Sequence, residues 1–235
     1  MRNIIVITPL RKEFDALIET LRPEDGATRE QPIGKLPAFD FPSLGIMIAL
    51  GGHGKVQFAL HVQYLLERRQ DVDLVVLAGV AGGLDEYLAV GDVVIASETI
   101  EHDYKERFDK LPSPRFPGDP ILLAWLKENG AILGKGFRVH CGPIASGDED
   151  VVSSDRAYEL RSATETLAVA WEGAGGARAC QFYGKPFLEI RGITDVANAA
   201  APKDFSKNLN QTIKNVSAIL LAIAKTGSPV AAIRS

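Results

Sequence analysis

The stretch DLVVLAGVAGG (residues 73–83) joins an almost wholly apolar run to a cluster of glycines. An apolar run without polar alternation, as at 73–78, is typical of a central strand that is buried on both faces. The glycines at 79–83 predict a turn after that strand, or a place where a ligand approaches the backbone closely. They lack the Gly-x-Gly-x-x-Gly spacing of a dinucleotide site, so the stretch predicts a buried strand without that fingerprint.

Strands and helices alternate on both sides of this stretch. Apolar residues at helical spacing predict helices at 11–21, 56–68, 173–183 and 205–224. The helix at 56–68 is expected to bury its apolar positions Val56, Ala59, Leu60 and Tyr64. Short β-rich runs predict further strands at 3–8, 44–50, 93–96, 138–144 and 187–193. This alternation predicts an α/β fold, a single-domain three-layer sandwich with a central mixed β-sheet flanked by helices.

Size and composition limit the class of protein. The 235 residues suffice for a large core, and we expect one domain over 1–225 with a flexible C-terminal tail at 226–235. The hydrophobic share of 46% and the charged share of 24% exclude a disordered or coiled-coil chain. A net charge of −4 gives no electrostatic basis for nucleic-acid binding. No apolar run reaches the ~18–20 residues of a membrane span. Neither a nucleic acid nor a membrane is therefore expected as a partner.

The two cysteines and the N-terminus favour a cytoplasmic protein. Cys141 and Cys180 are too few for a disulfide framework or a zinc site. We expect both thiols to be small buried hydrophobic groups. The early apolar run at 4–7 is too short for the core of a secretory signal peptide.

The segment GGHGK (51–55) invites comparison with a phosphate-binding loop. A P-loop has a glycine five positions before its Gly-Lys pair and a Ser or Thr after it. Ala49 and Val56 occupy those positions, so a nucleoside triphosphatase is excluded. The glycines predict either a tight strand-to-helix turn or backbone N–H groups presented to an anion or a sugar oxygen.

Two acidic residues stand near the ends of predicted elements, and a third lies inside a predicted strand. Glu172 follows Trp171 at the start of a helix, where it either complements the helix dipole or accepts hydrogen bonds from two sugar hydroxyls. Asp195 follows a strand, where it either caps a turn or acts as a general acid. Glu189 lies inside that strand and is expected to need a partner such as Arg191.

The segment 101–118 is charged, contains three prolines and has no clear period. It is interpreted either as a solvated surface loop or as a lid or subunit contact. His102 within it, like the other histidines, shows no metal-ligand spacing.

Seven short motifs follow one another along the chain. They are Glu13 after the first strand, Gly-His-Gly-Lys-Val (52–56), Ala-Gly-Gly-Leu (81–84), Val-Gly-Asp-Val-Val (90–94), Ser-Gly-Asp (146–148), Glu-Gly-Ala (172–174) and Arg-Gly-Ile-Thr-Asp-Val-Ala (191–197). Each motif is weak alone, but in this order they resemble the nucleoside phosphorylase/nucleosidase family, and the resemblance extends from residue 4 to about residue 224.

The resemblance implies a nucleoside phosphorylase-like fold and cleavage of the N-glycosidic bond of a purine ribonucleoside. Expected substrates are 5′-modified adenosines such as methylthioadenosine or S-adenosylhomocysteine. Asp195, held next to Thr194, is implied to protonate the departing purine. Glu172 is implied to bind the ribose hydroxyls, and Glu13 to position the attacking water. Proton transfers of this kind contribute roughly 100- to 10,000-fold each.

The same resemblance implies the rest of the substrate site. Val151 is expected to contact the edge of the base through its backbone, and Trp171 to pack on the sugar. The remaining positions expected to line the site are Val80, Ala81, Gly82 and Asp150.

The chain departs from the family pattern at three places. Glu149 and Asp150 follow Ser-Gly-Asp where an aromatic residue usually stacks on the purine, so the base preference stays open. Trp171 replaces the usual methionine before the ribose glutamate. Arg11 matches a phosphate-binding segment of the phosphorylase branch, but the turn at 79–82 lacks the arginine and serine that phosphorylases also use.

The sequence therefore favours a nucleosidase that uses water. A phosphorylase that holds phosphate with Arg11 is the first alternative, and a nucleoside-binding protein without catalysis is the second. No metal and no organic cofactor is implied. A homodimer is expected from the resemblance, with the segment 101–118 as a contact across the mouth of the site.

Overall fold

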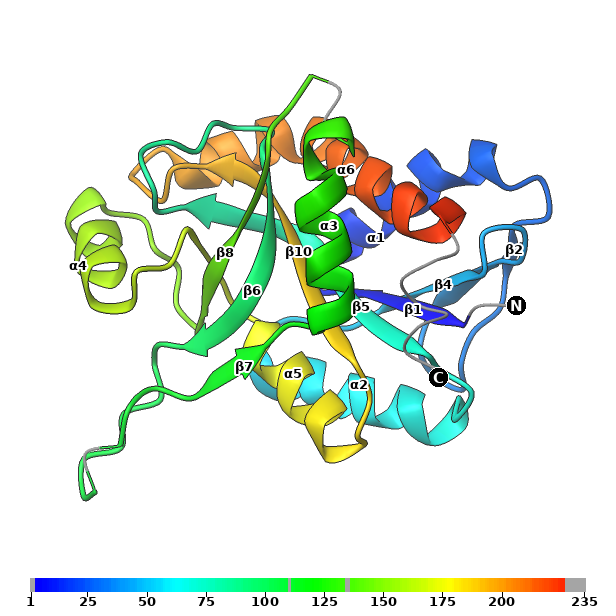
Figure 1. The fold of residues 1–235 in the computed structure, drawn as a ribbon, viewed down its shortest axis with the longest axis horizontal. Helices are drawn as coiled ribbons and strands as arrows, with labels where there is room; N and C mark the ends of the chain where they lie inside the picture. Colours follow the sequence, from blue (N-terminus) through cyan, green and yellow to red (C-terminus); the bar gives the residue numbers. More distant parts are fainter. Residues whose placement is uncertain (1–2, 110, 134–135, 227–235) are drawn as a thin grey trace.

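Strand β5 (Leu74–Gly83) lies at the centre of a mixed β-sheet and is buried along almost its whole length. The apolar run at 73–78 is therefore a central strand, as predicted. The computed structural model describes residues 3–109, 111–133 and 136–226 (Figure 1). The other strands are β1 (Ile4–Thr8), β2 (Arg29–Glu30), β3 (Ala38–Phe41), β4 (Ile46–Leu50), β6 (Val93–Glu101), β7 (Arg115–Pro117), β8 (Val139–Ser146), β9 (Ala168–Ala170) and β10 (Phe187–Asp195).

The sheet is mixed, and part of it closes on itself. Strand β5 pairs in parallel with β1 and with β10, and in antiparallel fashion with β9. The circuit β5–β10–β6–β8–β9 returns to β5, whereas β1, β4, β3 and β2 extend outward from it. The carboxyl ends of β1, β5 and β10 consequently reach one edge of the sheet together.

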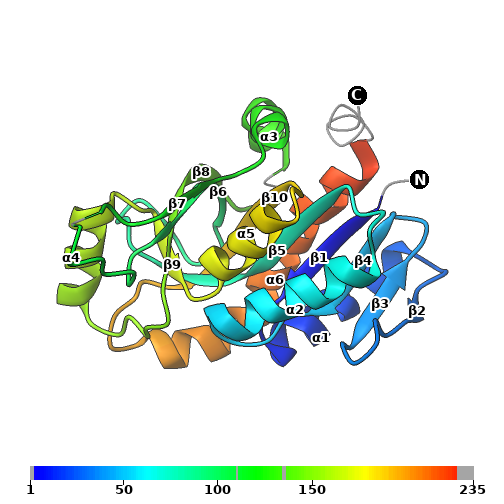
Figure 2. The same ribbon diagram turned by 90° about the horizontal axis from the view of Figure 1, so that it is seen from below.

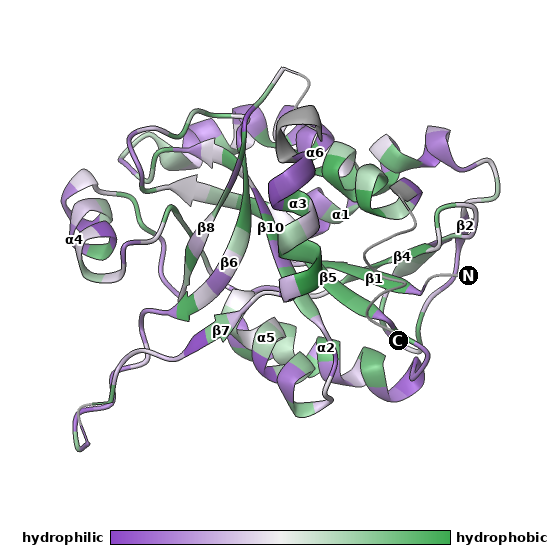
Figure 3. Ribbon diagram, viewed as in Figure 1, coloured by the Kyte–Doolittle hydropathy of each residue, from purple (hydrophilic) through white to green (hydrophobic). Residues whose placement is uncertain are grey.

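Helices cover both faces of the sheet (Figure 2). One face packs against α1, α3 and α6, and the other against α2 and α5. Figure 3 shows the central strands as hydrophobic and the helices as mixed, which agrees with helices that bury only one side. The helices are α1 (Arg11–Leu21), α2 (Lys55–Arg68), α3 (Pro120–Leu133), α4 (Ser154–Thr164), α5 (Gly173–Phe182) and α6 (Ala201–Thr226), with a 3-10 turn at Arg22–Glu24.

The predicted α/β class, with a central mixed sheet flanked by helices, is confirmed. The predicted inner face of α2 is wrong, because Val56 and Leu60 are 72% and 59% exposed. The helix instead buries Phe58, Val62, Leu65 and Leu66. Residues four and seven positions after Phe58 lie on its side of the helix, so the register of the apolar face differs from the expected one by two residues.

Several other features differ from the predictions: the ends of some elements, two further helices and the exposure of one cysteine. The glycines at 79–83 form no turn but continue β5, because β10 and β9 pair with them. Helices α3 and α4 were not predicted, and α6 begins four residues before the expected start. Cys141 is exposed, whereas Cys180 is buried as predicted. Thr226 ends α6, and residues 227–235 of the predicted tail lie outside the described residues.

The segment between β6 and β7 projects from the body of the protein (Figure 1). Its described part has no helix, and Phe108 within it is 97% exposed. The chain then rejoins the sheet as strand β7, which pairs with β6. Within the described residues, no helix is long and apolar enough to cross a membrane.

Candidate functional site

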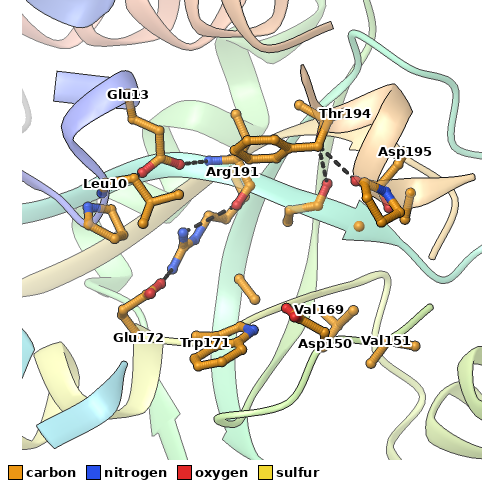
Figure 4. A pocket seen from close by; sticks show the side chains of 18 of the residues that line it. Leu10, Glu13, Asp150, Val151, Val169, Trp171, Glu172, Arg191, Thr194 and Asp195 are labelled. Carbon is orange, nitrogen blue, oxygen red and sulfur yellow. Dashed lines mark hydrogen bonds and ion pairs between the residues drawn. The ribbon is translucent and has the colours of Figure 1, made fainter. Parts of the chain in front are cut away.

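A cavity of about 440 Å³ opens at the carboxyl ends of β1, β5 and β10 (Figure 4). Ligands of open α/β sheets bind at such an edge, because loops and helix starts converge there. Ten of the eleven predicted site residues line this one cavity: Glu13, Val80, Ala81, Gly82, Asp150, Val151, Trp171, Glu172, Thr194 and Asp195.

Glu13 projects from the first turn of α1 and is 1% exposed. Its Oε1 accepts a hydrogen bond from the backbone N–H of Val80 at 2.8 Å, and its Oε2 accepts one from that of Leu10 at 2.9 Å. Burial raises the pKa of Glu13 to about 7, although the nearby charge of Arg191 and these hydrogen bonds oppose the rise. A carboxyl group with this pKa exchanges a proton readily at neutral pH.

Glu172 precedes α5 and is held by three groups from two segments, strand β10 and the turn at 51–55. Its Oε2 accepts a hydrogen bond from Nη2 of Arg191 at 3.2 Å. Its Oε1 accepts one from the N–H of Gly54 at 3.3 Å and lies 3.4 Å from Nδ1 of His53. A carboxylate has about four lone-pair sites, so Glu172 retains acceptor capacity toward the cavity.

Arg191 is 1% exposed inside β10, and the predicted pair with Glu189 is confirmed by a 2.8 Å contact from Nε to Oε1. Its Nη1 donates to the carbonyl oxygen of Val80 at 3.2 Å. Burial disfavours the charged guanidinium, but the surrounding carboxylates outweigh it and raise the pKa of Arg191. Arg191 is thus a fixed positive charge at the floor of the cavity.

Asp195 is the last residue of β10, not a residue beyond the strand as predicted. Its Oδ2 accepts a hydrogen bond from the hydroxyl of Thr194 at 2.8 Å, and its Oδ1 accepts one from the N–H of Ala197 at 3.0 Å. Burial raises the pKa of Asp195, and these two hydrogen bonds counteract part of that rise. The group is therefore better suited to hold and donate a proton than an exposed aspartate.

Trp171 forms a wall of the cavity together with His53. Their rings lie 4.2 Å apart with an interplanar angle of 30°. The hydroxyl of Ser146 donates to the carbonyl oxygen of Trp171 at 2.7 Å and accepts from the N–H of Ala174 at 2.9 Å. Ser146, at the end of β8, thus fixes the backbone that carries both Trp171 and Glu172.

The glycine-rich turn at 51–55 acts on the site through the protein itself. The N–H of Gly54 donates to Glu172, and the N–H of Lys55 donates to Asp148 at 2.9 Å. These two N–H groups are therefore bound to side chains, as the alternative of a tight strand-to-helix turn allows. The φ of +81° at Gly54 explains why a glycine stands there.

Asp150 lies along the same wall as Trp171 and Val151 in Figure 4. Its neighbour Glu149 turns to Arg156, with contacts of 2.7 and 2.8 Å from Nε and Nη2 to the two carboxylate oxygens. Asp150 itself is exposed and faces the cavity. An acidic side chain thus stands on the wall at a place where the family usually has an aromatic residue.

Arg11 is the predicted site residue that the structure separates from the others. Its side chain is 66% exposed and forms an ion pair with Asp15 at 2.9 Å, outside the cavity. Thirteen lining residues were not predicted, among them Leu10, His53, Arg191 and Phe205. A charged residue inside an otherwise apolar strand was a signal for Arg191, and the motif at 52–56 was one for His53. Nothing in the sequence singles out Phe205 or Leu10.

The mixed sheet, the cavity at the carboxyl ends of its strands and the acidic groups inside it define the α/β architecture that the family resemblance implies. The profile of the phosphorylase superfamily matches residues 3–225. The chain belongs to this superfamily, as the resemblance implied.

Relatives within the superfamily cover nearly the whole chain. The 5′-methylthioadenosine/S-adenosylhomocysteine nucleosidase of Bacillus pumilus is 29% identical over 231 residues, which are 95% of this chain and 98% of the relative. The structure of the nucleosidase of that name from Neisseria meningitidis, in complex with methylthio-immucillin-A, has a TM-score of 0.82 and 30% identity, with 95% and 99% of the two chains covered. The futalosine hydrolase of Helicobacter pylori has a TM-score of 0.82 and 27% identity, with 95% and 97% covered.

Proposed function

We propose that this protein hydrolyses the N-glycosidic bond of a purine ribonucleoside and releases the free base. The observation that carries the proposal is that Glu13, Glu172 and Asp195 line a single cavity, each in a different electrostatic environment. Relatives named as nucleosidases support hydrolysis. They also support 5′-modified adenosines, methylthioadenosine and S-adenosylhomocysteine first, as substrates.

Glu13 is proposed to activate water. Since its pKa is about 7, the carboxylate form is well populated at neutral pH and accepts a proton as the water oxygen bonds to C1′ of the ribose. The two backbone N–H groups that bind its oxygens hold the carboxyl in one orientation. The positive charge of Arg191 favours the ionised form and keeps the base available.

Glu172 is proposed to bind the two vicinal hydroxyl groups of the ribose. As the bond from C1′ to the purine breaks, the sugar develops positive charge, which a nearby carboxylate stabilises more than it stabilises the neutral ground state. The stacked rings of Trp171 and His53 would support this carboxylate and exclude water from that side.

Asp195 is proposed to protonate the departing base. The bonding electrons of the broken bond go to the purine, and a proton from Asp195 on the base nitrogen neutralises the charge that it acquires. Burial, which raises the pKa of Asp195, favours the protonated form that this step needs. After the reaction Glu13 has gained a proton and Asp195 has lost one, and exchange with solvent restores both.

The phosphorylase alternative requires a bound phosphate. Arg11, the residue proposed to hold phosphate, points away from the cavity. Among the described residues, the lysine that lines the cavity is Lys12. We therefore favour water as the nucleophile. A homodimer in the cytoplasm remains our proposal for assembly and location, and sedimentation of the purified protein tests the dimer.

Three variants test the assignment of roles. Glu13→Gln, Glu172→Gln and Asp195→Asn are each expected to slow base release by roughly 100- to 10,000-fold. Asp15→Asn makes the same kind of change on the exposed side of α1 and serves as the matched control. Wild-type turnover in the three cavity variants would refute the proposal. Tight nucleoside binding without base release by the wild-type protein would instead indicate a binding protein.

A further inference from the structure

Glu189 is a fully buried carboxylate beneath the cavity. It lies on β10 two residues before Arg191, so the two side chains project from the same face of the strand. Glu189 is absent from the cavity lining, and no step proposed above uses it. A buried charge is costly unless it is paired and hydrogen-bonded, so its presence in a central strand asks for a physical reason.

The structure provides Glu189 with a fitted site. Its Oε1 accepts the Nε proton of Arg191 at 2.8 Å, and its Oε2 accepts the hydroxyl proton of Thr99, from strand β6, at 2.6 Å. Gly173 leaves the necessary space, because a Cβ at that position would lie 2.3 Å from Oε2 of Glu189. Three elements of the fold therefore accommodate this one carboxylate.

Glu189 is linked to the cavity through Arg191. While Nε of Arg191 binds Glu189, Nη2 of the same guanidinium binds Glu172 at 3.2 Å, and Nη1 binds the carbonyl oxygen of Val80. A guanidinium is planar, so the bond at Nε constrains the directions of both terminal nitrogens. The bond to Glu189 thereby sets the direction from which Arg191 meets Glu172.

The cluster around Arg191 contains one guanidinium and three carboxyl groups, those of Glu189, Glu172 and Glu13. The charged side chains that act directly on Glu13 are Arg191, which favours its ionised form, and Glu172, which opposes it. His53 adjoins Glu172, and Lys12 lines the same cavity. Glu189 binds the same guanidinium that favours the ionised form of Glu13.

We infer that Glu189 is a positioning residue for the cavity. It orients Arg191, and through Arg191 the carboxylate of Glu172. Its negative charge also keeps Glu13 a stronger proton acceptor than it would be beside a less compensated Arg191. The consequences for turnover rest on the proposed hydrolysis, whereas the effect on the ionisation of Glu13 does not.

Glu189→Gln removes the charge and retains an oxygen that accepts the Nε proton of Arg191. Arg191 then acts on Glu13 with less compensation, which favours the carboxylate form, so the pKa of Glu13 falls. The acid limb of the pH–rate profile is expected to move to lower pH by about 0.5 to 1 unit. Glu189→Leu also removes the hydrogen bond that orients Arg191 and is expected to lower kcat/KM by a further ~10-fold or more. Compared with Glu189→Leu, Glu189→Gln therefore restores the orientation of Arg191 but not the negative charge.

Thr99→Val is the matched control, because it removes the other hydrogen bond to Glu189 and leaves every charge in place. It is expected to lower the midpoint of thermal unfolding without moving the acid limb. If Glu189 has a purely structural role, Glu189→Gln behaves like Thr99→Val. It is then less stable than the wild-type protein, and its pH–rate profile superimposes on that of the wild-type protein.

The ionisation of Glu13 is also measurable without substrate. In protein with 13C-labelled glutamate carboxyl groups, the Glu13 signal is assigned by its loss in Glu13→Gln, and its titration midpoint is compared in wild-type protein and Glu189→Gln. A lower midpoint in the variant supports the inference, and an unchanged midpoint overturns it. If the wild-type protein releases no base from any nucleoside, the proposed function fails while this titration still decides the inference.

Discussion

The pKa of Glu13 leads to a quantitative prediction for stability. Burial raises this pKa from the model-peptide value of 4.5 to about 7. Below pH 4.5 the carboxyl is protonated in both the folded and the unfolded chain. Between pH 4.5 and 7 the unfolded chain loses the proton more readily, so folding becomes less favourable as the pH rises. At 1.36 kcal/mol per pH unit, the full difference amounts to about 3 kcal/mol by pH 8.

Glu13→Gln removes this titration. Both oxygens of Glu13 accept backbone N–H groups, from Val80 and Leu10, so the amide group of Gln must face one N–H donor. That mismatch costs about 1–3 kcal/mol at every pH. The pH-dependent part is separate from this constant cost. The stability of Glu13→Gln relative to the wild-type protein is therefore expected to rise by about 3 kcal/mol between pH 4.5 and pH 8.

Urea unfolding at pH 4.5, 5.5, 6.5, 7.5 and 8.5 measures this difference, provided that the slope with urea is the same for both proteins. Asp15→Asn is the control, since Asp15 is exposed on the same helix and its substitution leaves the buried carboxyl in place. Other titrating groups, Asp195 among them, are present in both proteins and cancel in the comparison. Parallel stability curves for the wild-type protein and Glu13→Gln would refute the account of Glu13 as a buried carboxyl with a raised pKa.

Three further predictions concern single positions. Asp195→Asn cannot donate a carboxyl proton, so kcat for base release is expected to fall by roughly 100- to 10,000-fold in a steady-state assay, while the midpoint of urea unfolding changes little. Gly173→Ala forces a Cβ against the carboxylate of Glu189, and urea unfolding is expected to show that the free energy of unfolding falls by about 1–3 kcal/mol. Gly26→Ala serves as the control, because a Cβ at that position meets nothing within 4 Å. Arg11→Ala removes an exposed ion pair and a cation–π contact with Phe14, both outside the cavity, and is expected to leave base release unchanged with and without phosphate; a loss of activity that depends on phosphate would contradict the placement of Arg11 outside the site.

The fold was predictable where packing is local. The apolar run at 73–78 reads as a buried strand because both of its faces are covered, and the structure buries it. The end of that strand was not predictable, since residues 79–83 stay extended only because β10 and β9 pair with them. The buried face of α2 was not predictable for a similar reason. Val56 and Leu60 are as apolar as Phe58 and Val62, and the packing of α2 against the sheet and helix α5 decides which pair is covered.

The site was predictable where a motif and a chemical requirement coincide. The acidic residues Glu13, Glu172 and Asp195 were identified from their motifs, and the fold brings them to one cavity. The charge balance among them was not predictable, because it depends on Arg191 being enclosed by carboxylates from different segments. The sequence paired Arg191 with Glu189 across two positions of a strand, but its second contact with Glu172 exists only in three dimensions.

The most direct test of the account is base release by the wild-type protein with and without phosphate. The panel holds methylthioadenosine, S-adenosylhomocysteine, adenosine, inosine and uridine, with futalosine added because one structural relative carries that activity in its name. The account predicts release of free purine from a 5′-modified nucleoside in phosphate-free buffer, at a rate that phosphate does not raise. Release that occurs only when phosphate is present, or no release from any member of the panel, would contradict it.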